Sequence, residues 1–480
     1  MRVKEDSAAF YKTKEAWKEA IQERERAAAY QAAEDPWRQK LHLMPPVGWL
    51  NDPNGLCYFN GEYHVFYQYS PFSANGGNKY WGHYKSRDLI HFQSCPVMLY
   101  PEHSWDDRGV YSGSALIDHG KMYLYYTGNV KLEGDYDYIR NGREHNTAVA
   151  VSLDGITVQE EKLLLRNDDY PKDLTCHVRD PKVFAYEGKF YMVLGARTKS
   201  DIGQVLVWES EDKLNWRHIN TLKTEKPLGY MWECPDLFCL DGQWILMVSP
   251  QGVSHESYRF QNIYSSGYFL VYGDFRTQAY LGEYKEADIG FDFYAPQTFQ
   301  AQERRLLMGW MGMPDAEYSN PTVAYGWQHC MTIPRELKYA DGMLKMEPVR
   351  ELEQLRGEEI RVCVSGESAV ECPRTADILV DNHSEEFYFE YDQTFCLEWK
   401  AGCLQLRYLN KDYGRTCRKL RLKHLDKLRI IIDVSSAEIF VNAGEAVFSS
   451  RFYRNTERLL KVSGVFDMKI YGLDCENIQV

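Results

Sequence analysis

The stretch WLNDPNGLCYFNGEYHVFYQY, from Trp49 to Tyr69, consists of two aromatic, strand-forming runs on either side of Asn60-Gly61. Glycine readily takes the positive φ that a tight hairpin turn requires. The stretch therefore predicts two antiparallel strands. The first strand begins with polar residues, including Asp52, at a place where packing residues would be expected.

This pattern recurs, so that the chain contains five similar segments. They are NDPNGLCYFNGEYHVFY at Asn51, YSGSALIDHGKMYLYY at Tyr111, RDPKVFAYEGKFYMVL at Arg179, WECPDLFCLDGQWILMV at Trp232 and YAPQTFQAQERRLLMGW at Tyr294. Their leading residues are Asp52, Ser112, Asp180, Glu233 and Tyr294, spaced 53 to 68 positions apart. Each repeat has room for about four strands, which is typical of a propeller blade. Five repeats predict a five-bladed β-propeller over residues 37–340.

Three of the leading residues are acidic. The innermost strands of a propeller surround a central channel, so Asp52, Asp180 and Glu233 are expected to meet there. A single Asp beside Pro is more often a turn residue, but three acids in register favour a site. Like charges in a poorly solvated pocket raise a pKa, which leaves a protonated acid beside an ionised carboxylate. Glycoside hydrolysis uses such a pair.

Composition excludes several functions. The 480 residues carry a net charge of −13 with no basic run, which argues against nucleic-acid or membrane-surface partners. The charged N-terminus has no secretory signal pattern, and no apolar run approaches a membrane span. The twelve cysteines form no C-x-x-C pair and no His group has metal-ligand spacing. We therefore predict no metal, no cofactor and reduced thiols in a cytoplasm.

Two further regions flank the predicted propeller. Within an N-terminal extension, residues 1–36, the composition favours a helix, either a surface helix or one that docks through Trp17, Ile21 and Tyr30. Residues 341–480 show alternating strand patterns such as EFYFEYDQTFCLEW, which predict a C-terminal β-sandwich. The expected fold class is all-β, and the sandwich is expected to stabilise the enzyme.

The motifs WLNDPNG, YSGS, RDP, WECPD, DFYAPQ and GWM, in this order, resemble glycoside hydrolase family 32, the β-fructofuranosidases. The resemblance covers the chain after about residue 35 and implies a five-bladed propeller followed by a β-sandwich. It also implies retaining hydrolysis of terminal β-D-fructofuranosides, with Asp52 as nucleophile, Glu233 as general acid and base, and Asp180 as transition-state stabiliser. Retention implies that the carboxyl groups of Asp52 and Glu233 are about 5 to 5.5 Å apart. The charge of Asp180 is expected to keep Glu233 protonated.

The resemblance extends to sugar contacts. The expected contacts are Trp49, Asn51, Gln68, Trp81, Tyr111, Ser112, Arg179, Tyr294 and Trp310. Tyr111 stands where the family more often has Phe, and core packing is an equal alternative for Trp81 and Tyr111. Arg179 is expected to pair with Asp180 or to bind a sugar hydroxyl. Cys234 and His177 are expected to be structural.

The most specific expectation concerns the identity of the substrate. The segments TGNVKLEGDYDYIRNGREHN, LGARTKSDIGQV and SPQGVSHESYRFQNIYSSGYF resemble bacterial family members that cleave sucrose 6-phosphate. The first two contain Lys131, Arg140, Arg143, Arg197 and Lys199, of which one or two would bind the phosphate. Sucrose 6-phosphate is the preferred expectation, with sucrose and short fructans as alternatives. An inverting hydrolase and a non-catalytic sugar-binding propeller are less favoured, and no oligomeric state is indicated.

Overall fold

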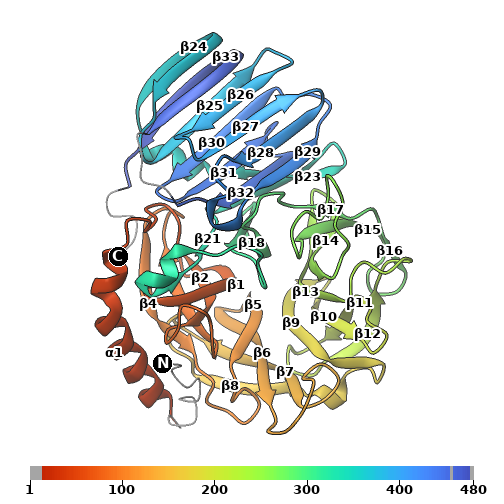
Figure 1. Cartoon of the computed structure of the whole chain (residues 1–480). Coiled ribbons are helices and arrows are strands. Elements are labelled where there is room, and N and C mark those ends of the chain that lie inside the picture. The colour runs from red at the N-terminus through yellow and green to blue at the C-terminus, as the bar shows by residue number, and fades with distance from the viewer. Residues whose placement is uncertain (1–12, 454–457, 476–480) are drawn as a thin grey trace.

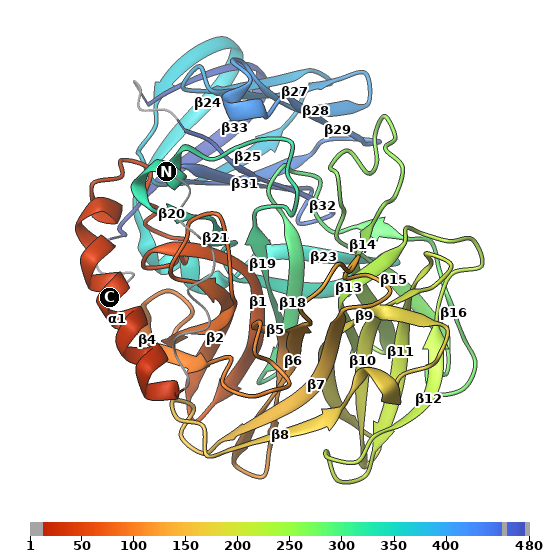
Figure 2. The same cartoon turned by 60° about the horizontal axis from the view of Figure 1, so that its bottom comes forward.

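The computed structural model describes residues 13–453 and 458–475, and it is built mainly of β-strands (Figure 1). Five sheets form a propeller, and the C-terminal strands form a sandwich beside it (Figures 1 and 2). The predicted fold class is thereby confirmed. Within the described ranges, no helix is long and apolar enough to cross a membrane.

Each blade is a sheet of antiparallel strands in chain order. The first blade has β1 (Gly48–Phe59), β2 (Glu62–Ser70), β3 (Tyr80–Ser86) and β4 (Phe92–Leu99), and the second has β5 (Val110–Asp118), β6 (Lys121–Lys131), β7 (Arg143–Ser152) and β8 (Glu160–Leu165). The third has β9 (Leu174–Tyr186), β10 (Lys189–Thr198), β11 (Gly203–Ser210) and β12 (Arg217–Leu222). The fourth has β13 (Met231–Leu240), β14 (Gln243–Gln251), β15 (Gly267–Gly273), β16 (Ala279–Leu281) and β17 (Lys285–Glu286). The fifth has β18 (Tyr294–Ala301), β19 (Arg304–Met311), β22 (Arg335–Ala340) and β23 (Met343–Pro348). The propeller therefore continues past the predicted boundary at residue 340.

The predicted hairpin turns connect the first two strands of four blades. Asn60 and Gly61 have φ values of 50° and 84°, and the turns at His119-Gly120, Glu187-Gly188 and Asp241-Gly242 likewise have two successive positive φ angles. Two positive φ angles are the signature of a type I′ turn, whose twist matches that of the flanking strands. The hairpins of the propeller are therefore encoded locally.

The ring is closed by chain segments that are distant in sequence. The short strand β20 (Trp327–Gln328) pairs in parallel with β1, and β21 (Cys330–Met331) pairs with β19.

The helix α1 (Lys14–Ala33) lies along the outside of the first blade (Figures 1 and 2). It packs through Trp17 and Ile21, which are buried, whereas Tyr30 is 77% exposed. The docking role expected for Tyr30 is therefore wrong, and Ala28 and Ala32 are buried instead because they face the sheet.

The C-terminal strands form one sheet around a long central strand. They are β24 (Arg356–Glu371), β25 (Ala376–Asn382), β26 (Phe387–Tyr391), β27 (Phe395–Lys400), β28 (Cys403–Tyr408), β29 (Cys417–Arg421), β30 (Lys427–Asp433), β31 (Ser436–Val441), β32 (Ala446–Arg451) and β33 (Leu459–Leu473). One edge of β33 pairs with β24, and its other edge pairs with β26 and then with β25. Two half-sheets therefore diverge from β33. Phe389 and Leu404 of one pack with Ile430 and Ile439 of the other in a single core, which makes the sandwich.

Buried charges join the propeller to the sandwich. His42 lies between Asp433 and Glu438 of the sandwich, at 2.8 Å and 2.9 Å, and all three side chains are fully buried. The two carboxylates raise the pKa of His42 to about 9 although burial opposes the charge. Arg335 of β22 also pairs with Glu438.

The 3₁₀ helices η2 (Asn167–Asp169), η3 (Pro321–Tyr325), η4 (Arg350–Leu355) and η5 (Asp412–Gly414) lie in connecting segments.

Candidate active site

The innermost strands of all five blades are irregular at the same level. The pairing register of β1, β5, β9, β13 and β18 shifts close to where each strand enters the channel. In four of them a proline stands at the shift, and a proline has no N–H to donate to a neighbouring strand. Such bulges re-aim side chains, so that two successive residues can face the channel instead of alternating.

Two rings of side chains result. The inner ring consists of Asp52, Ser112, Asp180, Cys234 and Ala295, which precede Pro53, Gly113, Pro181, Pro235 and Pro296 respectively. Asp180, Cys234 and Ala295 share positive φ angles of 64°, 48° and 47°. The residues before them, Asn51, Tyr111, Arg179, Glu233 and Tyr294, form the outer ring. Glu233 and Tyr294 are thus one residue out of register with Asp52 and Asp180, which corrects the equivalence read from the repeats.

All members of the two rings except Cys234 and Ala295 line a pocket of about 320 Å³. This volume is within the range of small-molecule sites. The pocket brings together the three carboxylates and every predicted sugar contact except Trp81. Trp81 has no exposed surface and packs with Phe66 and Leu124 between the first two blades. The prediction that Trp81 contacts the sugar is therefore corrected: its indole N–H donates to the carbonyl of Tyr111 at 3.1 Å and supports the pocket from behind.

A hydrogen-bond network orients Asp52. Asn51 Nδ2 donates to Asp52 Oδ1 at 3.0 Å and to Gln68 Oε1 at 2.6 Å. Ser112 Oγ donates to Asp52 Oδ2 at 2.5 Å and accepts from Gln68 Nε2 at 2.7 Å. Trp49 Nε1 in turn donates to Asn51 Oδ1 at 2.8 Å. Burial raises the pKa of Asp52, while the bonds from Ser112 and Asn51 oppose the rise.

Asp180 shares a neighbour with Asp52. The backbone N–H of Cys234 donates to Asp180 Oδ2 at 2.9 Å, and the Cys234 thiol lies 3.7 Å from an oxygen of each carboxylate. Burial raises the pKa of Asp180 to about 7; the charges of Glu233 and Asp52 add to the rise and Arg179 opposes it. Burial, helped by these carboxylates, also raises the pKa of Cys234 well above its usual value, so it remains a thiol.

Glu233 accepts hydrogen bonds from three side chains. Arg179 Nη2 bonds to Oε1, while Gln251 Nε2 and the hydroxyl of Tyr294 donate to Oε2 at 2.8 Å and 2.7 Å. Arg179 lies 3.9 Å from Asp180, so it bridges the two acids. A cation rather than Asp180 is therefore the direct neighbour of Glu233, in contrast to the expectation from the sequence.

His177 positions that cation. Its Nδ1 accepts from Arg179 Nη1 at 2.6 Å, and its Nε2 contacts the carbonyl of Tyr138 at 3.1 Å. Burial, with the charge of Arg179, lowers the pKa of His177 to about 2, so the ring stays neutral. An accepting Nδ1 requires such a neutral ring.

Some pocket residues were missed by the sequence reasoning. Lys79 and Asp315 line the pocket but belong to none of the quoted segments. Burial lowers the pKa of Lys79 to about 7, while the charge of Asp52 opposes that change. Gln251 lies in the quoted segment SPQGVSHESYRFQNIYSSGYF, but it was not among the expected contacts; it ends β14, directly opposite Met231 at the start of β13.

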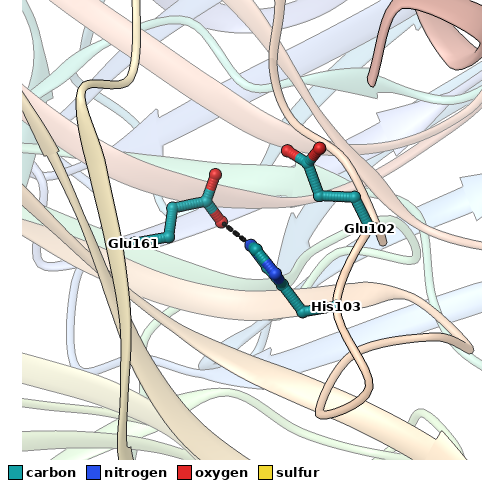
Figure 3. A group of neighbouring side chains, drawn as sticks. All are labelled: Glu102, His103 and Glu161. Carbon is teal, nitrogen blue, oxygen red and sulfur yellow. Dashed lines mark hydrogen bonds and ion pairs between the residues drawn. The ribbon is translucent and has the colours of Figure 1, made fainter. Parts of the chain in front are cut away.

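A separate group of potential metal ligands lies outside the pocket. Glu102 and His103 precede β5, Glu161 lies in β8, and their ligand atoms are within 4.8 Å of one another (Figure 3). The sequence spacing did not predict this group. His103 Nε2 lies 3.1 Å from Glu161 Oε2. An ion pair accounts for the arrangement without an ion.

Comparisons with known proteins extend over almost the whole chain. Residues 42–348 match the Glycosyl hydrolases family 32 N-terminal domain, and residues 370–467 match Glycosyl hydrolases family 32 C terminal. A sucrose-6-phosphate hydrolase of Bacillus subtilis is 40% identical over 460 residues, covering 92% of this chain and 94% of that protein. A raffinose invertase of Escherichia coli is 40% identical over 87% of this chain and 90% of that protein.

Solved structures agree with these relatives. A β-fructofuranosidase of Bombyx mori superposes with a TM-score of 0.86 at 29% identity, covering 96% of this chain and 99% of that one. A sucrose-6-phosphate hydrolase of Lactobacillus gasseri superposes with a TM-score of 0.86 at 27% identity, covering 95% and 96%.

Proposed function

The chain belongs to glycoside hydrolase family 32, and from this premise we propose that it cleaves terminal β-D-fructofuranosides with retention. The observation that carries the proposal is the meeting of Asp52, Asp180 and Glu233, from three different blades, in one pocket. Two roles are needed from them, a nucleophile and a proton donor. In the proposal, the third carboxylate, Asp180, holds sugar hydroxyls and stabilises positive charge at the anomeric carbon.

Asp52 is the nucleophile of the proposal. One of its oxygens attacks the anomeric carbon of the fructosyl unit while the bond to the leaving oxygen breaks and Glu233 protonates that oxygen. The product is a fructosyl ester of Asp52. Glu233 then takes a proton from water, the water oxygen attacks the anomeric carbon, and the carboxylate of Asp52 leaves. Two inversions give net retention.

The contacts of each carboxylate suit its role. Asn51 and Ser112 hold Asp52 so that its oxygens keep a fixed direction toward the channel. Arg179, Gln251 and Tyr294 fix Glu233, which must carry a proton before it can act as acid. The separation of about 5 to 5.5 Å between the carboxyl groups of Asp52 and Glu233 stays a prediction of the retaining mechanism.

The test of the mechanism combines a variant with product analysis. Asp52→Asn should fold and should lose turnover by several orders of magnitude, because an amide is a poor nucleophile. Near-normal turnover in a sequence-verified sample would refute the role of Asp52. The first-formed fructose should have the anomeric configuration of the substrate in an NMR time course. Inverted product would indicate a different carboxylate geometry, and no turnover by the natural protein would indicate a sugar-binding propeller.

Sucrose 6-phosphate is the preferred substrate in our proposal, with sucrose and short fructans as alternatives. It is supported by the relatives that are named sucrose-6-phosphate hydrolases. The decisive measurement is kcat/KM for sucrose, its 6-phosphate and a short fructan on one preparation. If the phosphorylated sugar is no better than sucrose, this choice of substrate fails while fructoside hydrolysis stands.

A cytoplasmic location follows from the same proposal. A sugar phosphate is charged and does not cross a bilayer unaided, so its hydrolase must work where the phosphate is attached. Cell fractionation with an antibody against the protein tests this. Recovery of the protein and its activity outside the cell would contradict the location.

A further inference from the structure

Two cations in the pocket wall have no part in the proposed chemistry. Arg143, at the start of β7, and Lys79, immediately before β3, both line the catalytic pocket. Within the described part of the chain neither side chain has an acidic partner within salt-bridge distance. Lys79 instead places its ammonium 5.1 Å from the ring centre of Trp49. The whole chain has a net charge of −13, so cations left without a carboxylate partner require a reason.

The surroundings of Arg143 are positive. Its Nε is buried and has no hydrogen-bond partner. Lys131 is its register partner on β6, and Arg179 stands on the next blade. Burial, followed by the charge of Arg179, lowers the pKa of Arg143, while Tyr111 opposes that effect. A half-buried guanidinium among other cations is costly unless an anion joins it.

Arg143 and the backbone of Lys79 both lie near Tyr111 of the outer ring. Arg143 interacts electrostatically with Tyr111. At Gly109, an added Cβ would lie 3.1 Å both from the backbone nitrogen of Lys79 and from the ring of Tyr111. The two cations therefore reach the pocket from adjacent blades, Arg143 near Tyr111 and Lys79 with its ammonium over the ring of Trp49. The fructosyl unit must reach Asp52 in the inner ring, so the leaving sugar occupies the space nearer the outer ring.

Four other basic residues are already engaged. Arg140 and Arg197 both pair with Asp201, at 3.4 Å and 2.8 Å. Lys199 donates to the carbonyl of Lys172 at 2.7 Å. Arg179 is held by Glu233 and His177. Of the five cations expected from the sequence, Arg143 alone lines the pocket.

We propose that Arg143 and Lys79 form an anion subsite that binds the phosphate carried by the leaving sugar of the substrate. The inference rests on the fructosidase function proposed above and names the side chains that distinguish a phosphorylated from a free disaccharide. A guanidinium and an ammonium give charge-assisted hydrogen bonds to phosphate oxygens. Each such bond is expected to change kcat/KM by about tenfold or more.

The experiment compares two substrates in five proteins. The natural protein, Arg143→Gln, Arg143→Lys, Lys79→Gln and the control Arg140→Gln are each assayed for kcat/KM with sucrose and with sucrose 6-phosphate. The ratio of the two values should fall about tenfold or more in Arg143→Gln and in Lys79→Gln, and less in Arg143→Lys, which keeps the charge. Arg140→Gln should keep the natural ratio, because Arg140 pairs with Asp201 outside the pocket.

Product inhibition gives a second readout that does not require the phosphorylated substrate. Glucose 6-phosphate should inhibit sucrose hydrolysis by the natural protein more strongly than glucose does. This difference should shrink in Arg143→Gln. Circular dichroism and thermal unfolding identify a variant that fails to fold; in that case Arg143→Lys and Lys79→Gln decide the outcome.

The outcomes separate this inference from the function beneath it. If neither sugar is hydrolysed, the proposed function fails. If the natural protein does not prefer the phosphorylated sugar, the substrate and the subsite both fail, although fructoside hydrolysis stands. If the natural protein prefers it and both Arg143→Gln and Lys79→Gln keep that preference, the subsite is overturned alone.

Discussion

Replacing Asp180 with Asn should make the protein more stable at pH 8, although it removes a proposed catalytic group. Asp180 is only 6% exposed, and burial together with the nearby acids raises its pKa from 3.8 to about 7. Between these two pH values the folded protein holds a proton that the unfolded chain has released. The free energy of unfolding therefore falls as pH rises toward 7. From pH 5 to pH 8 the fall is about 3 kcal/mol, at 1.36 kcal/mol per pH unit.

Calorimetric unfolding of the natural protein and of Asp180→Asn at pH 5 and pH 8 measures this difference. All other groups titrate in both proteins, so the change in Tm between the two pH values should be smaller in Asp180→Asn by several degrees. Glu286 provides a matched control outside the pocket, because burial also raises its pKa to about 7. Glu286→Gln should lose the same pH dependence while keeping turnover. Equal pH dependence in the natural protein and Asp180→Asn would refute the reasoning.

Three further predictions concern single groups. Glu233→Gln should be least harmful on fructosides whose leaving group needs no proton, and an equal loss of kcat on all substrates would count against its role as acid. Since burial raises the pKa of Asp52, the acid limb of kcat/KM should lie above pH 3.8; a pH–rate profile with its limb at or below that value would contradict an ionised Asp52 nucleophile. The pKa of His42 is raised to about 9, so its stabilising effect is complete below pH 6.5 and is lost as pH rises through 9. His42→Gln should therefore lower the free energy of unfolding at pH 6 by roughly 3 to 5 kcal/mol. In this variant the free energy of unfolding, measured by denaturation, should differ less between pH 6 and pH 9.5 than in the natural protein.

Several features of this protein follow from its sequence alone. The Asn60-Gly61 turn and its three counterparts depend on residues adjacent in the chain, and glycine tolerates the backbone angles they need. Five repeated segments at blade spacing suffice to predict the propeller, and alternating patterns predict the sandwich. Asp52 and Asp180 converge because equivalent positions in a ring of repeats surround the same axis, and Glu233, next to the equivalent position, joins them.

Other features depend on contacts that no local pattern records. The repeats suggest that Glu233 is equivalent to Asp52, but in the structure Cys234 holds that position and Glu233 precedes it. The bulge that causes this difference depends on the pairing of β13 with β14. Trp81 is buried, rather than exposed to sugar, because the second blade covers it. Arg179 bonds to Glu233 on the next blade, and Lys79 and Arg143 reach the pocket from adjacent blades. Strand periodicity determines which residues alternate, whereas the packing of neighbouring blades determines which of them are covered and which face the channel.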